Sequence, residues 1–207
     1  MNSPTVKRDL KDCKTNRMHV ENASQGFSLL LQSGVEISCT VNLPLMQLLQ
    51  QEFKLSQGQI DALDVFLLDG KPVDSPKETI VPDGSRLALA AGLPGIAGLA
   101  MKSNSAVKGL RPGITHGVLD ATGTPSSPAH GSMELVLYSL ALKNLAGHFL
   151  ASGFTLKTAK ALEALETGLQ GDFTINGQTL DRAGALRFLA SLPAESSIYL
   201  TASIASS

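Results

Sequence analysis

The sequence predicts an α+β protein, in which two blocks of mixed strands and helices are separated by a connector rich in glycine and proline. Hydrophobic residues make up 43% of the 207 residues, which is enough for a buried core and excludes general disorder. Alternating and helical apolar patterns follow one another in both blocks. Between the blocks, residues 93–132 carry closely spaced glycines and prolines, which interrupt helices and central strands.

Charge and targeting signals narrow the classes of function. The formal net charge is −1 and the isoelectric point is about 6.4, so the chain lacks the basic field of a nucleic-acid-binding protein. Residues 1–25 are polar and charged, without the apolar stretch of a secretory signal, and we expect them to form a flexible leader. Residues 87–101 are apolar but too short to span a bilayer. We therefore expect a cytoplasmic protein that binds neither nucleic acid nor membranes.

The cysteines and histidines show no metal-binding pattern. Neither Cys-x-x-Cys nor His-x-x-x-His occurs, and the four histidines are scattered along the chain. We expect no metal and no cofactor. Cys39 lies on the apolar side of an alternating run, which favours a small core residue over a reactive thiol.

The first block spans residues 26–92 and is expected to begin with a hairpin. Residues 27–31 and Val35–Val41 are β-prone runs on either side of Ser33-Gly34. The alternation within the second run places its odd-numbered residues, Val35, Ile37, Cys39 and Val41, on one buried face.

A helix, a strand, a turn and a final strand complete the first block. Asn42 is the expected helix cap and Pro44 lies in the first turn. Apolar residues then recur at helical spacing at Leu45, Leu48, Leu49 and Phe53. The remaining elements are a strand over Val65–Leu68, a tight turn at Asp69-Gly70 and a strand over Arg86–Ala91.

The second block, residues 133–207, repeats this pattern more loosely. We expect a strand at 133–138 leading into a helix that ends before Gly153, a strand at 154–156, a helix over 158–169, a strand-turn pattern at 173–180, a helix capped by Asp181 and a strand over 197–203. Two explanations of the repetition stay open. The block is either a degenerate duplication of the first block, or a product of the packing rules that α+β proteins share.

Two segments of the first block carry a resemblance to a known family. Residues 65–73 (VFLLDGKPV) form a strand that ends in an Asp-Gly turn, and residues 79–89 (TIVPDGSRLAL) form a turn into a last strand. Residues 27–91 thereby resemble the β-grasp, ubiquitin-like fold of the MoaD/ThiS group of sulfur carriers. Ser85 stands where the family usually has Asp. The resemblance implies a β-grasp module over 26–92, followed by a smaller α+β module over 133–207.

The resemblance implies two functions. Sulfur carriers act through a C-terminal Gly-Gly whose carboxylate is activated, but the first block continues as Ala91-Gly92-Leu93-Pro94-Gly95 and the chain ends in Ser206-Ser207. A carrier for molybdopterin or thiamine biosynthesis would need cleavage after Gly92 or Gly95. We therefore expect a non-enzymatic protein-binding module, with the processed sulfur carrier as the alternative. The implied partner is another protein, such as an E1-like activating enzyme or a biosynthetic synthase.

The extension after the first block supplies the candidate binding residues. Residues 93–116 are apolar, rich in glycine and free of acidic side chains, which suits either a loop packed on the sheet or a loop that docks a partner or an anion. The candidate partner-binding residues are Gly92, Leu93, Pro94, Gly95, Met101, Lys102, Lys108, Arg111 and His116. Ser105 and Lys108 also match the Ser-x-x-Lys pattern of serine hydrolases, but the Ser-Asp-Asn and Lys-Thr-Gly motifs that accompany it are absent. A serine hydrolase is therefore the last of three hypotheses.

Overall fold

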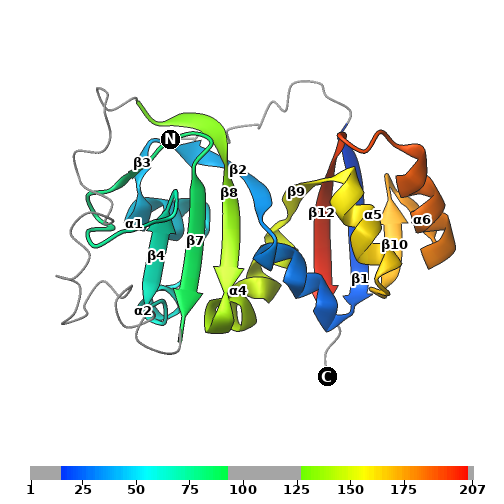
Figure 1. The fold of residues 1–207 in the computed structure, drawn as a ribbon, viewed down its shortest axis with the longest axis horizontal. Coiled ribbons are helices and arrows are strands. Elements are labelled where there is room, and N and C mark those ends of the chain that lie inside the picture. The colour runs from blue at the N-terminus through cyan, green and yellow to red at the C-terminus, as the bar shows by residue number, and fades with distance from the viewer. Residues whose placement is uncertain (1–14, 93–126, 205–207) are drawn as a thin grey trace, which may run out of the picture.

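The protein is built on one long, twisted, mixed sheet (Figure 1). The computed structural model describes residues 15–92 and 127–204. Ten strands lie in the order β11-β10-β1-β12-β9-β2-β8-β7-β4-β5. Their bounds are β1 Asn16–Ala23, β2 Val35–Val41, β4 Val65–Leu68, β5 Lys71–Pro72, β7 Arg86–Ala91, β8 Ala129–Tyr138, β9 Phe154–Lys157, β10 Asp172–Ile175, β11 Gln178–Leu180 and β12 Ser197–Ile204. Strands β3 (Leu43–Pro44) and β6 (Ile80–Val81) form a separate pair. The α+β class predicted from the sequence is confirmed.

The sheet consists of two halves with the same strand order. In the first half, β2-β8-β7-β4-β5, the neighbouring pairs are antiparallel, parallel, antiparallel and antiparallel in turn. In the second half, β9-β12-β1-β10-β11, the same sequence of pairings recurs. The halves meet where Glu36 of β2 lies opposite Thr155 of β9. Each half therefore has a central parallel pair with a hairpin at its outer edge.

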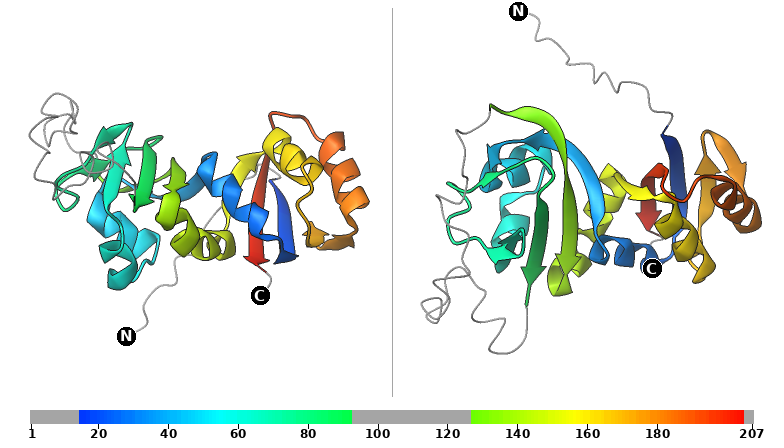
Figure 2. Two further views of the ribbon diagram at one scale, coloured as in Figure 1. Left: turned by 60° about the horizontal axis from the view of Figure 1, so that its bottom comes forward. Right: turned by 45° about the horizontal axis from the view of Figure 1, so that its top comes forward.

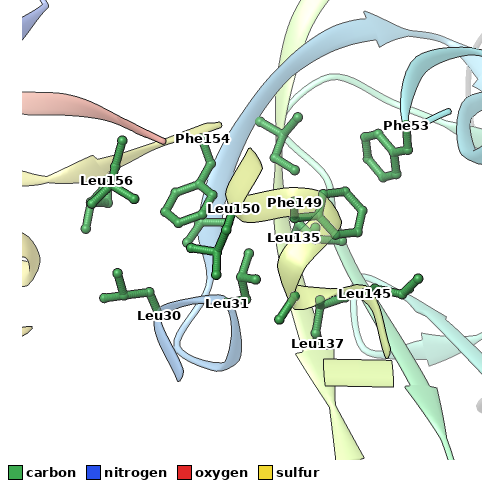
Figure 3. Packing of buried hydrophobic residues seen from close by; sticks show 14 of the residues in the cluster. Leu30, Leu31, Phe53, Leu135, Leu137, Leu145, Phe149, Leu150, Phe154 and Leu156 are labelled. Atoms are coloured by element: carbon green, nitrogen blue, oxygen red, sulfur yellow. The ribbon is translucent and has the colours of Figure 1, made fainter. Parts of the chain in front are cut away.

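Helices cover the apolar face of this sheet. They are η1 Gln25–Gln32, α1 Leu45–Gln47, η2 Leu48–Glu52, α2 Gln57–Asp61, α4 Ser139–Ser152, α5 Thr158–Glu166 and α6 Arg182–Ser191. Their buried side chains join one continuous core with the strands. Figure 3 shows the middle of this core, where Phe149 of α4 packs edge to face on Phe53 at 5.3 Å between ring centroids. The helix α4 also packs on β7 of the first half and on β12 of the second half, and it thus ties the two halves together.

Several predicted elements are confirmed. The alternation in β2 buries Val35, Ile37, Cys39 and Val41. The side chain of Asp181 caps α6 by accepting a hydrogen bond from the amide of Gly184 at 2.7 Å. The turns Asp69-Gly70 and Asn176-Gly177 both have positive φ at their two residues, as a type I′ hairpin turn requires. The predicted cap Asn42 is wrong, because α1 begins after Pro44.

The predicted hairpin at the start of the first block is wrong. Residues 27–31 lie in the 3-10 helix η1, where Phe27, Leu30 and Leu31 are buried. Their spacing fits a helix and not an alternating strand. The antiparallel partner of β2 is instead β8, in which Leu135 lies opposite Val35.

The predicted leader and linker are each wrong over part of their length. Asn16–Ala23 forms β1 between β10 and β12, where Met18 and Val20 are buried. Residues 129–132 belong to β8, so the predicted boundary at 132 falls inside a strand. Charged neighbours mask the short apolar alternation of β1 in the sequence. The remaining leader residues 1–14 and the extension 93–126 lie outside the described residues.

Candidate functional site

Gly92 is the one predicted partner-binding residue within the ranges that the structure describes. Outside these ranges lie Leu93, Pro94, Gly95, Met101, Lys102, Lys108, Arg111 and His116, and also Ser105. Gly92 follows the last residue of β7. Its amide donates a hydrogen bond to Asp64 Oδ2 at 2.8 Å, and its carbonyl accepts one from Ser139 Oγ at 3.5 Å. Its φ is +64°, and a Cβ would lie 2.6 Å from a methyl carbon of Leu140. Only glycine fits this position without strain.

A groove of about 440 Å³ lies beside the end of β7, between α2 and α4. Four buried side chains, Leu63, Ala91, Ala141 and Leu145, give it an apolar base. Ser56, Gly58, Gln59, Ala62 and Asn144 form its half-buried or exposed rim. We call this hollow the α2–α4 groove.

The rim of the α2–α4 groove is held by a capping box. The hydroxyl of Ser56 accepts a hydrogen bond from the amide of Gln59 at 3.3 Å, and Gln59 Oε1 accepts one from the amide of Ser56 at 2.9 Å. These reciprocal bonds satisfy two amides at the start of α2. The sequence analysis missed α2, although the Ser-x-x-Gln pattern could have predicted its first turn. The groove itself could not be predicted, because α4 comes from a distant part of the chain.

A second hollow of about 380 Å³ lies where β2 and β9 meet. The Lys160 ammonium donates to the carbonyls of Ser33 and Gly34, both at 3.1 Å. Glu134, on the same wall, pairs with Arg86 at 3.3 Å. Because these charges have partners within the chain, we interpret this hollow as the junction between the two halves and not as a binding site.

The outer face of the second half is polar. His19 Nδ1 lies 2.8 Å from Thr201 Oγ1, and the Arg17 guanidinium lies 5.7 Å from the centre of the Tyr199 ring. The Tyr199 hydroxyl donates to the carbonyl of Ser152 at 2.8 Å. Of the other histidines, His148 is half-buried, with Nε2 2.6 Å from the carbonyl oxygen of Phe53.

Cys39 is 4% exposed, which confirms its prediction as a core residue. Burial raises the pKa of its thiol to about 12, and the nearby carboxylates of Glu52 and Asp83 add to the shift. The thiol is therefore protonated at neutral pH. Because the thiolate is the nucleophilic form, Cys39 is chemically inert in the folded protein.

Over residues 15–92 and 127–204, no group of three or more His, Cys, Asp or Glu side chains is placed to hold a metal ion. Within the same ranges, no helix has the length and apolar character needed to cross a membrane. Comparisons with protein-family models, with curated proteins and with solved structures gave no match.

Proposed function

We propose that this protein is a non-enzymatic, cytoplasmic protein-binding module whose first half is a β-grasp unit of the MoaD/ThiS type. The support is topological. The elements β2, α1–η2, β4, β5 and β7 follow the order that the resemblance implies, and α1–η2 packs on the core face of their sheet together with α4. The strand next to β2 is the exception, because β8 takes the place expected for residues 27–31.

The observation that carries the binding function is the α2–α4 groove. Its apolar base can take up side chains, while the amide of Asn144 on its rim can both donate and accept hydrogen bonds. This combination suits an extended peptide segment, whose backbone offers one donor and one acceptor per residue. We propose that a partner protein, such as an activating enzyme or a synthase, binds here through such a segment.

The sulfur carrier is the less well supported alternative. Cleavage after Gly92 would place the new carboxylate on a residue whose amide is bonded to Asp64 and beside which Leu140 leaves no room for a Cβ. An activating enzyme needs a free, thin tail, so the end of β7 would first have to detach. Intact mass spectrometry separates the two functions, because a carrier would appear as a chain ending at Gly92 or Gly95, with sulfur replacing one oxygen.

Affinity purification of the tagged full-length chain tests the binding proposal. Ala62→Arg places a long cation on the exposed rim of the groove, and Ala190→Arg makes the same change at an exposed position of α6. We expect Ala62→Arg to weaken the binding of the recovered partner at least about tenfold, equivalent to about 1.4 kcal/mol, and Ala190→Arg to leave it unchanged. Equal binding by both variants would contradict a groove-centred interface.

A further inference from the structure

The strand β1 belongs to the second half of the sheet but precedes the first half in the chain. In the first half the equivalent strand is β7, which follows the hairpin β4–β5 in sequence. The hairpin β10–β11 is instead followed by α6 and β12, and β1 fills the place between β10 and β12. Figure 1 shows β1 in blue beside the red strand β12. Among the described elements, β1 is joined to the rest of the fold at its C-terminal end only.

Both halves hold this strand by the same contacts. The amide of Asn176, in the β10–β11 turn, donates to the carbonyl of Arg17 at 2.8 Å, and its Oδ1 accepts from the Arg17 amide at 2.9 Å. In the first half the amide and Oδ1 of Asp69 make the same two bonds with Arg86 of β7, both at 2.8 Å. Met18, the next residue of β1, belongs to the continuous core. The place between β10 and β12 is thus a strand-binding site, and its contacts do not depend on which copy of the chain supplies β1.

The connection that keeps β1 on its own chain is short and strained. β1 ends at Ala23 and η1 begins at Gln25, so Ser24 alone lies between them. In the left view of Figure 2, η1 runs from this point toward α4, on which it packs. Asn22 has a φ of +51°, a left-handed conformation that residues other than glycine adopt at a cost. We call residues 22–24 the hinge. Short hinges under strain favour the exchange of a terminal element between copies of a chain.

We propose that β1 exchanges between two copies of this chain, so that each second half is completed by β1 of the other copy. In this exchanged dimer the hinge is extended, and β1 makes with β10 and β12 of the other copy the contacts that it makes here within its own chain. The interface is extensive, because all eight residues of the strand move and the strand pairs on both sides. Extension also releases Asn22 from its left-handed conformation. This goes beyond the proposed binding function, which needs neither β1 nor a second copy.

The order of folding favours the exchange. His19 of β1 and Thr201 of β12 have side chains 2.8 Å apart, yet they are 182 residues apart in the chain. Closing so long a loop costs entropy and is slow. The strand and its binding site therefore stay unpaired until late in folding, when β1 of a second copy competes with the chain's own β1. That competition depends on chain concentration, because the chain's own β1 has a fixed effective concentration.

Disulfide trapping of the full-length chain tests the exchange. In a chain whose two native cysteines are replaced, His19→Cys with Thr174→Cys joins β1 to β10, since these residues lie opposite each other. The matched control is Leu67→Cys with Ala88→Cys, which joins β4 to β7 at the equivalent position of the first half. After refolding at high chain concentration and oxidation, we expect disulfide-linked dimers from the first pair and disulfides within single chains from the control. Disulfides within single chains from both pairs, or dimers formed equally by both, would overturn the proposal.

Opposite changes at Asn22 give a second test. Glycine adopts positive φ freely, so Asn22→Gly should stabilise the closed hinge; because each dimer contains two hinges, we expect its dissociation constant to rise about tenfold. Proline cannot adopt positive φ, so Asn22→Pro should open the hinge and increase the dimer fraction. Light scattering measures both, and Asn42→Gly, at a left-handed asparagine outside the hinge, is the matched control. If Asn22→Gly dimerises to the same extent as Asn42→Gly, the hinge does not control association and the proposal is wrong, whether or not the proline variant folds.

Discussion

Replacing Met18 by alanine tests whether the N-terminal strand β1 is part of the core. Met18 is 1% exposed, and it lies opposite Ile175 of β10 on one side and Leu200 of β12 on the other. Truncating a buried methionine to alanine costs about 2–5 kcal/mol, through lost transfer free energy and the cavity left behind. For a chain of this size, each kcal/mol lowers Tm by about 2–4 °C. We therefore expect Met18→Ala to lower Tm by about 4–20 °C.

Thermal unfolding followed by circular dichroism measures this effect, and Glu21→Ala is the matched control. Glu21 belongs to the same strand but is exposed, so its truncation should change the free energy of unfolding by no more than about 0.5 kcal/mol. Hydrogen exchange should show faster exchange in β10 and β12 of Met18→Ala, because these strands flank the cavity. If Met18→Ala and Glu21→Ala unfold at the same temperature, β1 does not contribute to the core and the assigned strand order is wrong.

Three further predictions follow from single positions. Burial raises the pKa of Cys39 from 9.0 to about 12, so the thiol ionises at lower pH in the unfolded chain than in the folded one. The free energy of unfolding should therefore fall by about 1.4 kcal/mol per pH unit from pH 9 to 12. Urea titrations of Cys39→Ala should lack the part of this pH dependence that Cys39 contributes. Gly153 has a φ of +85° and lies against a tyrosine hydroxyl, so Gly153→Ala should destabilise the protein by about 1–3 kcal/mol. Gly147 lies in the middle of α4 with open space beside it, so Gly147→Ala should stabilise the protein by about 0.5–1 kcal/mol. Denaturant unfolding measures both changes. A double-mutant cycle on Phe53 and Phe149 should give a coupling of about 0.5–1.5 kcal/mol from their edge-to-face contact; a coupling near zero would contradict it.

Local patterns predicted local structure well. The alternation in β2, the Asp69-Gly70 and Asn176-Gly177 turns and the Asp181 cap depend on residues that are close in sequence, and all are confirmed. The strand β1 had the same kind of signal, because Met18 and Val20 alternate with polar neighbours. The prediction of a flexible leader is wrong at β1 because charged residues dominate the composition of the surrounding segment, which is typical of a solvated arm.

The pairing of strands could not be predicted in the same way. The partner of β2 is β8, which lies far along the chain beyond the glycine-rich extension. Residues 27–31 are close to β2 in sequence, but the spacing of Phe27, Leu30 and Leu31 fits the 3-10 helix that they form, and β8 takes the place beside β2. The α2–α4 groove depends on the same non-local arrangement, since α4 follows directly from β8.

The two halves bear on the origin of the repeated pattern. Packing rules that α+β proteins share fix the layers, but they leave five strands free to adopt many orders and directions. Here both halves have the same order, the same directions and the same turn conformation in the hairpins β4–β5 and β10–β11. This agreement favours duplication over shared packing rules.

The two halves differ in the order of their strands along the chain, and this difference constrains folding. In the first half the strand parallel to β8 is β7, which follows the hairpin in sequence, whereas in the second half its counterpart is β1, from the opposite end of the chain. The second half therefore cannot close until β12, near the C-terminus, pairs with β1. Closing so large a loop costs entropy before the contacts form, and non-local pairing of this kind slows folding. The first half contains β2 through β8 without β1 or β12, so it can form first and present β2 as the edge on which β9 and the second half assemble.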